Sequence, residues 1–480
     1  ITGEELTGQD VIVEGEFHGE KRFLTVTGSY TIGNLDISGE STVNLNVAGK
    51  ITNGIYMHSG DELSLIAKDA NIEGYINITG GAAKLTGGKI ITGDIYEKEE
   101  GIYLQEDIRV NEQSSLSLDG VEVNGNIMAE NKDSEINIKN STVNEGVFYA
   151  AEPIDGRYQL VMDENGKPIV EGYTELQAEV GGIVTVENSV LNTSLSAYGE
   201  GSKMTVTNSS VKTKGGVLAA EGGKIYLNGN ADTVYEVAKD GYFMAASTNQ
   251  ADTTTKIEIN GGTLKIENLR YLTGVGPDEN GNTNPCLDES YQGEEQTFYA
   301  VKGGIVLKGE GVIETKGDQI FEHGVDVSSD EAVLNSTSGA VTNDAISYEG
   351  GTLKLTDEKY SWNYVDSAKA ALMNYQSNSA TKIVMAGDLV TDGEINEIDV
   401  DKATTVGDDV ELDKVTVNAD KNLLVGSEST SLTDKEIDGV VVGDTVVNGF
   451  SAGKLNLAAE STGMVITNAK NVTLGGSAGG

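Results

Sequence analysis

The residues best suited to catalysis or metal binding are few and widely spaced along this chain. The three histidines, His18, His58 and His323, lie far apart and show no metal-ligand spacing, so each is predicted to be a surface or turn residue. Cys286 is the single cysteine and has no partner for an intrachain disulfide. The sequence holds no nucleophile elbow, phosphate-binding loop or dinucleotide fingerprint.

One polar segment has the residue types of a calcium loop. Asp278, Asn280, Asn282 and Glu289 match ligand positions of the EF-hand loop, and their oxygens are the ligands that Ca²⁺ prefers. The central glycine of that loop is replaced by Thr283, and no flanking helices are evident. The sequence therefore allows either a structural Ca²⁺ at these four residues or an ordinary polar loop. No other cofactor is expected.

Aromatic residues crowd the middle of the chain. Tyr360, Trp362 and Tyr364 alternate, so a strand would place all three on one face. Tyr271 and Tyr291 lie in an interruption of the repeat described below. These five residues either pack in the core or form an exposed platform for a glycan or protein, and they are the predicted ligand-binding residues.

The charge balance narrows the classes of partner. The chain has 76 Asp and Glu against 33 Lys and Arg, a formal net charge of −43. Nucleic acid is a poor partner for such a surface, because affinity for phosphates comes largely from Lys and Arg. Anionic lipid is disfavoured for the same reason. No apolar run of about 20 residues is present, so this segment is not expected to insert into a membrane.

The elements that must position any site form a repeat of short alternating strands. Leu116-Ser117-Leu118 and Ile136-Asn137-Ile138 start at positions 116 and 136, and two further short strands follow the first of them before the second begins. Other copies start at Val43, Leu63, Val184, Met204, Ile225, Ile257, Ile305 and Leu353. Three strands in about twenty residues predict an all-β chain, a right-handed parallel β-helix (β-solenoid).

Two columns of residues support this prediction. Gly or Asn recurs four positions after the strand start, at Gly120, Asn140, Asn188, Asn208, Gly229, Gly261 and Gly309. Gly and Asn tolerate left-handed backbone, and stacked Asn amides can hydrogen-bond between repeats. Ala129, Ala197 and Ala219 form a second, small-residue column suited to a tight inner corner.

The repeat is interrupted, which defines the predicted organisation. The β-helix covers 1–392, with a hairpin insertion near 153–179 centred on Asp163–Gly166 and a long loop near 268–296. A short helical break is expected near 361–379. Residues 393–474 are expected to form irregular acidic terminal coils or a cap, and 475–480 a flexible linker.

The copies Ile136-Asn137-Ile138-Lys139-Asn140-Ser141 and Met204-Thr205-Val206-Thr207-Asn208-Ser209 resemble those of bacterial autotransporter passenger domains. The resemblance covers most of residues 1–390 by pattern and composition, and it transfers no functional residue. It implies a surface adhesin, displayed extracellularly on or shed from a Gram-negative bacterium and exported as part of a larger chain. Its partners would be a host-cell glycan or protein, or neighbouring cells through self-association.

Two functions therefore stay open. The first is a non-catalytic adhesin or structural stalk. The second is a polysaccharide-active lyase or glycoside hydrolase on a β-helix scaffold. A lyase needs a strong base near its substrate, and this chain has only four arginines, at positions 22, 109, 157 and 270. Enzymatic activity is left uncertain but is the less favoured expectation.

Overall fold

A computed structural model describes most of the first two thirds of the chain and short segments beyond. The described residues are 7–13, 22–58, 63–92, 108–149, 151–154, 157–167, 170–238, 241–267, 288–291, 294–297, 299–316, 319–321, 325–329, 331–338, 341–343, 352–355 and 359–361. From 382 to 474 only the strands β44 to β55 are described. The described part is all-β, with long parallel sheets and no helix, which is consistent with a β-solenoid.

The chain divides into two compact units. Unit 1 comprises Ile1–Asn228 and Thr233–Gly241, and unit 2 comprises Gly229–Asp232 and Tyr242–Gly480. Each unit is built from strands that pair in parallel with the strand about one repeat away.

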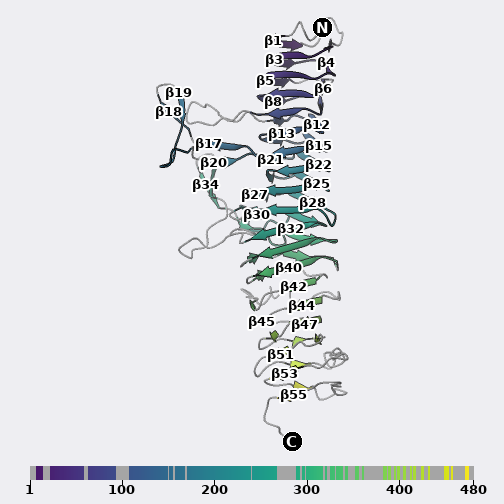
Figure 1. Ribbon diagram of the computed structural model, residues 1–480, viewed down its shortest axis with the longest axis vertical. Coiled ribbons are helices and arrows are strands. Elements are labelled where there is room, and N and C mark those ends of the chain that lie inside the picture. The colour runs from purple at the N-terminus through teal and green to yellow at the C-terminus, as the bar shows by residue number, and fades with distance from the viewer. Residues whose placement is uncertain are drawn as a thin grey trace. The chain divides into compact units, whose positions relative to one another are not determined.

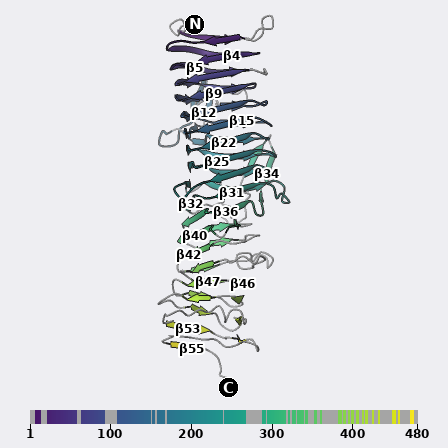
Figure 2. The same ribbon diagram turned by 90° about the vertical axis from the view of Figure 1, so that its right-hand side faces the viewer.

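Unit 1 contains three parallel ladders, whose strands lie one above another in Figure 1 and, turned by 90°, in Figure 2. The first runs β2 (Arg22–Thr25), β4 (Ser41–Leu45), β6 (Ser64–Lys68), β9 (Ala82–Thr86), β12 (Ser115–Asp119), β15 (Glu135–Lys139), β22 (Ile183–Glu187), β25 (Lys203–Thr207) and β28 (Lys224–Asn228). The other two share β1 (Thr7–Val13), β3 (Tyr30–Ile37) and β5 (Gly49–Met57).

Beyond β5 these two ladders separate. One continues through β7 (Ala70–Glu73), β10 (Lys89–Ile91), β13 (Glu122–Asn124), β16 (Thr142–Asn144), β23 (Val190–Asn192), β26 (Ser210–Thr213) and β29 (Val234–Val237). The other continues through β8 (Tyr75–Ile78), β11 (Ile108–Val110), β14 (Ile127–Glu130), β21 (Glu175–Glu179), β24 (Ser194–Tyr198) and β27 (Gly216–Ala220). Three strands per repeat therefore match the predicted pattern.

The register of the first ladder confirms most of the predicted strand alignment. Leu116 pairs with Ile136, and Val184 pairs with Met204. Two alignments were wrong. Val43 pairs with Leu65 and not with Leu63, so this repeat is two residues longer than the predicted twenty. The strand at Leu353, β42 (Thr352–Leu355), lies in a different ladder from the strand at Ile305.

The core of unit 1 is a stack of inward-facing aliphatic side chains. Burial alternates along each strand of the first ladder, as in β12, where Leu116 and Leu118 are buried between half-exposed residues. The predicted alanine column is confirmed and gains a member: Ala129, Ala178, Ala197 and Ala219 pair in sequence, each fully buried. Burial of about 25 cal/mol per Å² of apolar surface makes this stack the main stabilising term.

The predicted Asn and Gly turns adopt left-handed backbone. Asn140, Asn188 and Asn208 have φ of 49°, 50° and 47°. The N–H of each of these residues donates to a carbonyl of the next repeat, as Asn140 does to Glu187 at 3.1 Å. Amide-to-amide bonds occur in another column, where Asn192 Nδ2 donates to Asn144 Oδ1 at 3.1 Å and Asn144 Nδ2 to Asn124 Oδ1 at 2.8 Å.

A buried serine follows each of the turn residues Asn140, Asn188 and Asn208. Ser189 Oγ accepts the backbone N–H of Ser141 at 3.1 Å and donates to the Glu187 carbonyl at 2.8 Å. Ser209 Oγ does the same for the N–H of Ser189, at 2.9 Å. In the turn, some backbone groups leave the strand pairing but stay buried. The serine ladder gives these groups hydrogen-bond partners, and burial without partners would destabilise the fold.

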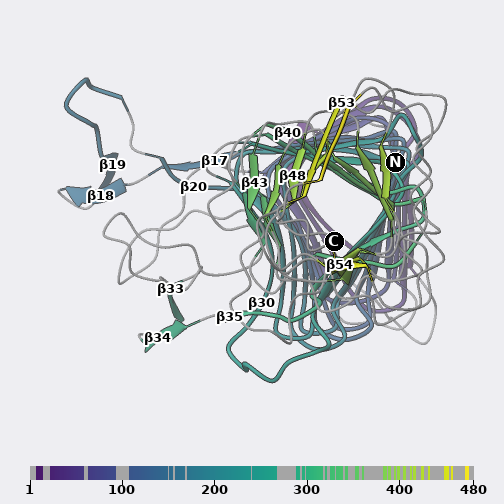
Figure 3. The same ribbon diagram turned by 90° about the horizontal axis from the view of Figure 1, so that it is seen from below.

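The first insertion leaves the stack as two short antiparallel ladders. β17 (Val147–Tyr149) pairs with β20 (Val170–Tyr173), and β18 (Ala151–Ile154) pairs with β19 (Arg157–Leu160). Figure 3 shows both outside the ring of stacked strands. The predicted Asp163–Gly166 turn forms, but the strands paired are not the ones expected to flank it. Regular pairing resumes at Glu175, within the predicted range 153–179.

Unit 2 repeats the parallel pattern. One ladder runs β31 (Lys256–Asn260), β36 (Ile305–Lys308) and β39 (Val325–Val327). A second runs β32 (Thr263–Glu267), β37 (Val312–Lys316), β40 (Val333–Ser338), β42, β44 (Lys382–Met385), β47 (Glu397–Val400) and β50 (Val415–Val417).

Shorter pairings also occur in unit 2, among them the parallel pair β38 (Gln319–Phe321) and β41 (Val341–Asn343). β30 (Tyr242–Ser247) and β35 (Tyr299–Ala300) are antiparallel, as are β33 (Asp288–Tyr291) and β34 (Glu294–Thr297) within the second predicted insertion. Two parallel ladders lie in the last part of the chain. One is β43 (Lys359–Ser361), β45 (Asp388–Val390), β48 (Thr404–Val406), β51 (Leu423–Val425), β53 (Asn448–Ala452) and β55 (Asn471–Leu474). The other is β46 (Glu394–Ile395), β49 (Glu411–Leu412), β52 (Ser431–Leu432) and β54 (Asn456–Leu457), so parallel pairing extends through the region expected to be irregular.

We predict that Ser189→Ala lowers the free energy of unfolding by about 1–3 kcal/mol, because the Ser141 N–H loses its acceptor in a buried turn. Ser117→Ala, on the outward side of β12, is the matched control and should change stability by less than about 0.5 kcal/mol. Denaturant unfolding of both variants measures the difference. Equal effects from the two substitutions would contradict a stabilising role of the serine ladder.

Candidate functional site

The predicted ligand-binding residues are only partly described. Tyr360 lies in β43, where its backbone aligns with Leu389 of β45. Tyr291 ends β33 and pairs with Glu294. Tyr271, Trp362 and Tyr364 lie outside the described residues, as does the expected helical segment after Ser361. The aromatic platform therefore stays a prediction.

The predicted calcium loop is in the same position. Glu289 lies in β33, opposite Gln296, whereas Asp278, Asn280 and Asn282 lie outside the described residues. Within the described part of the chain, no group of three or more His, Cys, Asp or Glu side chains could hold a metal ion.

A cluster of aromatic and polar side chains lies instead on the outward face of β3, β5 and β8. We call it the Tyr56 cluster: Asp10, Asn34, Asp36, Tyr56, His58 and Tyr75. The rings of Tyr56 and Tyr75 have centroids 4.2 Å apart at an interplanar angle of 52°. The ring of His58 stacks with that of Tyr56, at 5.9 Å and 13°. Rings from β5, from β8 and from the residue after β5 thus lie together.

The repeat assembles this cluster. Asp36 is the register neighbour of Tyr56, and Asn34 aligns with Gly54, which aligns with Tyr75. Outward-facing residues one repeat apart therefore become side-by-side neighbours.

Gly54 allows Tyr75 to lie across β5. A Cβ at Gly54 would lie 3.0 Å from two carbons of the Tyr75 ring and 2.5 Å from its carbonyl oxygen, and Gly54 has a φ of +128°. The Tyr75 hydroxyl then reaches β3 and donates to Asn34 Oδ1 at 3.2 Å. The backbone N–H and the Nδ2 of Asn34 donate to Asp10 Oδ1, at 2.8 and 3.1 Å. The ring is thus held at its face and at its hydroxyl.

A histidine–carboxylate pair completes the cluster. His58 Nε2 lies 2.9 Å from Asp36 Oδ1, and the two side chains are 51% and 35% exposed. The prediction that His58 is a surface residue is confirmed. The cluster offers two half-buried tyrosine rings beside carboxylate, amide and imidazole groups, all reachable from solvent.

This site was not predicted from the sequence, because its members are separated by whole repeats and do not cluster along the chain. The signal was present in the repeat, since positions 36, 56 and 77 and positions 34, 54 and 75 differ by about one period. Register pairs within each set confirm that these positions are neighbours.

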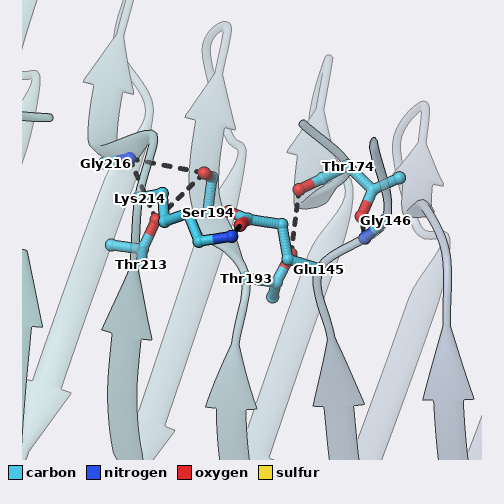
Figure 4. Close-up of polar contacts among 8 residues, drawn as sticks. All are labelled: Glu145, Gly146, Thr174, Thr193, Ser194, Thr213, Lys214 and Gly216. Atoms are coloured by element: carbon cyan, nitrogen blue, oxygen red, sulfur yellow. Dashed lines mark hydrogen bonds and ion pairs between the residues drawn. The ribbon is translucent and has the colours of Figure 1, made fainter. Parts of the chain in front are cut away.

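A second polar group lies where the first insertion leaves and rejoins the stack (Figure 4). The Gly146 N–H donates to Thr174 Oγ1 at 2.6 Å, and the Thr174 N–H donates to the Gly146 carbonyl at 3.1 Å. Thr193 Oγ1 in turn donates to the Thr174 carbonyl at 2.9 Å. These bonds close the base of the insertion and fasten it to the next repeat.

Glu145 precedes this closure, and its side chain points inward from a half-buried residue. Its side chain is 8% exposed, and its Oε2 lies 3.5 Å from Nζ of Lys214, whose side chain reaches toward it in Figure 4. Its Oε1 has no hydrogen-bond partner. Burial raises the pKa of the Glu145 carboxyl, and the Lys214 ammonium only partly opposes the shift.

We predict that Glu145→Gln raises the melting temperature near pH 7. An acid whose folded pKa is raised stabilises the fold below its unfolded pKa of about 4.3 and loses that contribution as pH rises through the folded pKa. The neutral amide avoids this loss, so the gain should vanish below about pH 4. Exposed Glu200→Gln is the control. A gain for Glu145→Gln that is equal at pH 3.5 and pH 7 would contradict the argument.

Comparisons with protein-family models, with curated proteins and with solved structures found no match to this chain. No helix among the described residues is long and apolar enough to cross a membrane.

Proposed function

We propose that this chain is a right-handed parallel β-helix with coils of about twenty residues that acts as a non-catalytic surface adhesin or structural stalk. Its setting would be the extracellular surface of a Gram-negative bacterium, to which it is exported as part of a larger chain. Its partners would be a host-cell glycan or protein, or the same protein on a neighbouring cell. Nucleic acid and membrane insertion have no role in this proposal.

One observation carries the proposal: regular stacking is interrupted by an insertion without losing register. β15 pairs with β22 in the same manner as β22 pairs with β25, although the first step spans 48 residues and the second 20. Segments that project from a regular scaffold commonly carry binding. The scaffold then supplies stability and the insertion supplies recognition.

The prediction follows that excising the first insertion removes adhesion and leaves the fold intact. Asn144 aligns with Asn192 and Glu175 with Ser194, so a single residue should connect Asn144 to Glu175. Deleting 145–173 joins Asn144 to Thr174 and recreates the spacing of Asn192-Thr193-Ser194. Beads coated with the wild-type chain should adhere to epithelial cells or to each other, and beads coated with the deletion variant should not.

Two controls define the outcome. Replacing 145–173 by a Gly-Ser segment of equal length should also abolish adhesion, because only the recognition surface is lost. Unchanged far-UV circular dichroism and melting temperature would show that the scaffold is intact. Full adhesion by either variant, or none by the wild type, would refute the role of the insertion.

The alternative function, cleavage of polysaccharide, is tested on the same protein. Incubation with neutral and acidic polysaccharides, followed by reducing ends and by absorbance of unsaturated products, should show no turnover. Release of product would replace the adhesin by a polysaccharide-active enzyme.

A further inference from the structure

We propose that the Tyr56 cluster is a binding site for neutral hexopyranosides, built on the sheet wall of unit 1 and separate from the insertion. The proposal deepens the proposed function, on which it rests for the setting in which a glycan is met. Its physical basis is independent, because it uses only side chains of β1, β3, β5 and β8 and of the residue after β5.

On β3, β5 and β8, the site can bind a ligand only through side chains. β3 has β1 and β5 as neighbours, β5 has β3 and β8, and β8 has β5 and β11. Backbone groups of β3, β5 and β8 are engaged in the sheet on both sides, so an added peptide strand has no edge to pair with at the strands that carry Tyr56 and Tyr75. A ligand must therefore contact the rings and polar groups that project from the wall.

The site combines an aromatic surface with neighbouring hydrogen-bonding groups. A hexopyranose has apolar C–H faces and hydroxyls around its rim, so it needs an aromatic surface next to hydrogen-bonding groups. Tyr56 and Tyr75 supply ring surface, while Asp36 and Asn34 lie beside those rings in the register. Tyrosine provides large contact area with few rotatable bonds, so little conformational entropy is lost on binding.

The side chains of the Tyr56 cluster are held in place before any ligand binds. Tyr75 is fixed by Gly54 and by its hydrogen bond to Asn34, Asn34 by Asp10, and Asp36 by His58. Preorganised groups bind more tightly because less ordering is needed on association.

The negative charge of the site favours neutral sugars over acidic ones. The two carboxylates, Asp10 and Asp36, outnumber the single titratable base of the cluster, His58, and the chain has a net charge of −43. Like charge opposes the approach of uronates and sialylated glycans. Nucleic acids are excluded for the same reason. Neutral hexose chains match both the rings and the field.

The test uses the purified full chain with cellohexaose, maltohexaose, laminarihexaose and mannohexaose, and with polygalacturonate as the acidic probe. Saturation-transfer NMR should detect at least one neutral oligosaccharide, and titration calorimetry should give its affinity. Tyr56→Ala and Tyr75→Ala should each weaken that affinity about tenfold or more, and Tyr56→Phe should retain most of it. Polygalacturonate should bind more weakly than the best neutral sugar.

Tyr226→Ala is the matched control, since Tyr226 is a half-buried tyrosine on the other sheet, beside Lys203. It should leave sugar affinity unchanged. Circular dichroism and melting temperature check that each variant is folded, and Asp36→Asn provides a second variant that retains both rings and should also weaken binding.

The inference is overturned if the wild-type chain binds none of the neutral sugars at about 10 mM, where even millimolar affinities are detectable. It is also overturned if folded Tyr56→Ala and Asp36→Asn bind like the wild type. Failure here with loss of adhesion on excising 145–173 would leave the proposed function standing. Sugar binding by the Tyr56 cluster without adhesion by the wild-type chain would support the sugar site and refute the proposed function.

Discussion

Parallel, in-register stacking is the constraint on which the rest of unit 1 depends. Within each ladder, a strand between the two ends hydrogen-bonds to a strand one repeat before and to a strand one repeat after, so stacked residues occupy equivalent environments. Most inward positions are apolar, and the alanine column from Ala129 to Ala219 shows how closely side-chain size is matched. Turns face a harder requirement, because their backbone groups leave the strand ladder while remaining buried.

Serine and asparagine meet that requirement in different ways. Asn140 and Asn188 accept left-handed backbone and pass their N–H groups to the next repeat. Ser141 and Ser189 use one hydroxyl both to accept from the preceding repeat and to donate within their own turn. Both devices need a partner one repeat away, which ties turn stability to stacking and favours cooperative folding along the column.

This constraint explains what could be predicted from the sequence. Strand positions, the glycine and asparagine turns and the alanine column follow from a period that is visible in the chain. The alignment of Leu63 failed because the repeat that contains it is two residues longer than twenty, and composition does not mark where the extra residues lie. The pairing within the first insertion was missed because Asp163–Gly166 suggested a local hairpin, whereas β18 pairs with β19, and both precede that turn.

The base of the insertion shows where stacking tolerates an exception. Gly146 and Thr174 are hydrogen-bonded to each other, although the insertion lies between them in the chain. The geometry at the base of the insertion is therefore close to that of a regular turn. The cost falls on Glu145, whose carboxylate is buried with one oxygen unpartnered. A carboxylate in such an environment is destabilising unless it is paired, and the Lys214 ammonium is the ion-pair partner that the structure gives it.

The outward positions are free of the packing requirement, and this freedom is where chemistry can enter. Asp36 and Tyr56 differ completely in type yet occupy equivalent places in adjacent repeats, as do Asn34, Gly54 and Tyr75. Inside the stack such differences would leave cavities or clashes, whereas outside they create a surface of mixed rings and polar groups. Local density of aromatic residues could not reveal that surface, because its members are separated by whole repeats. Reading outward residues at the period of the repeat, and not along the chain, is what brings them together.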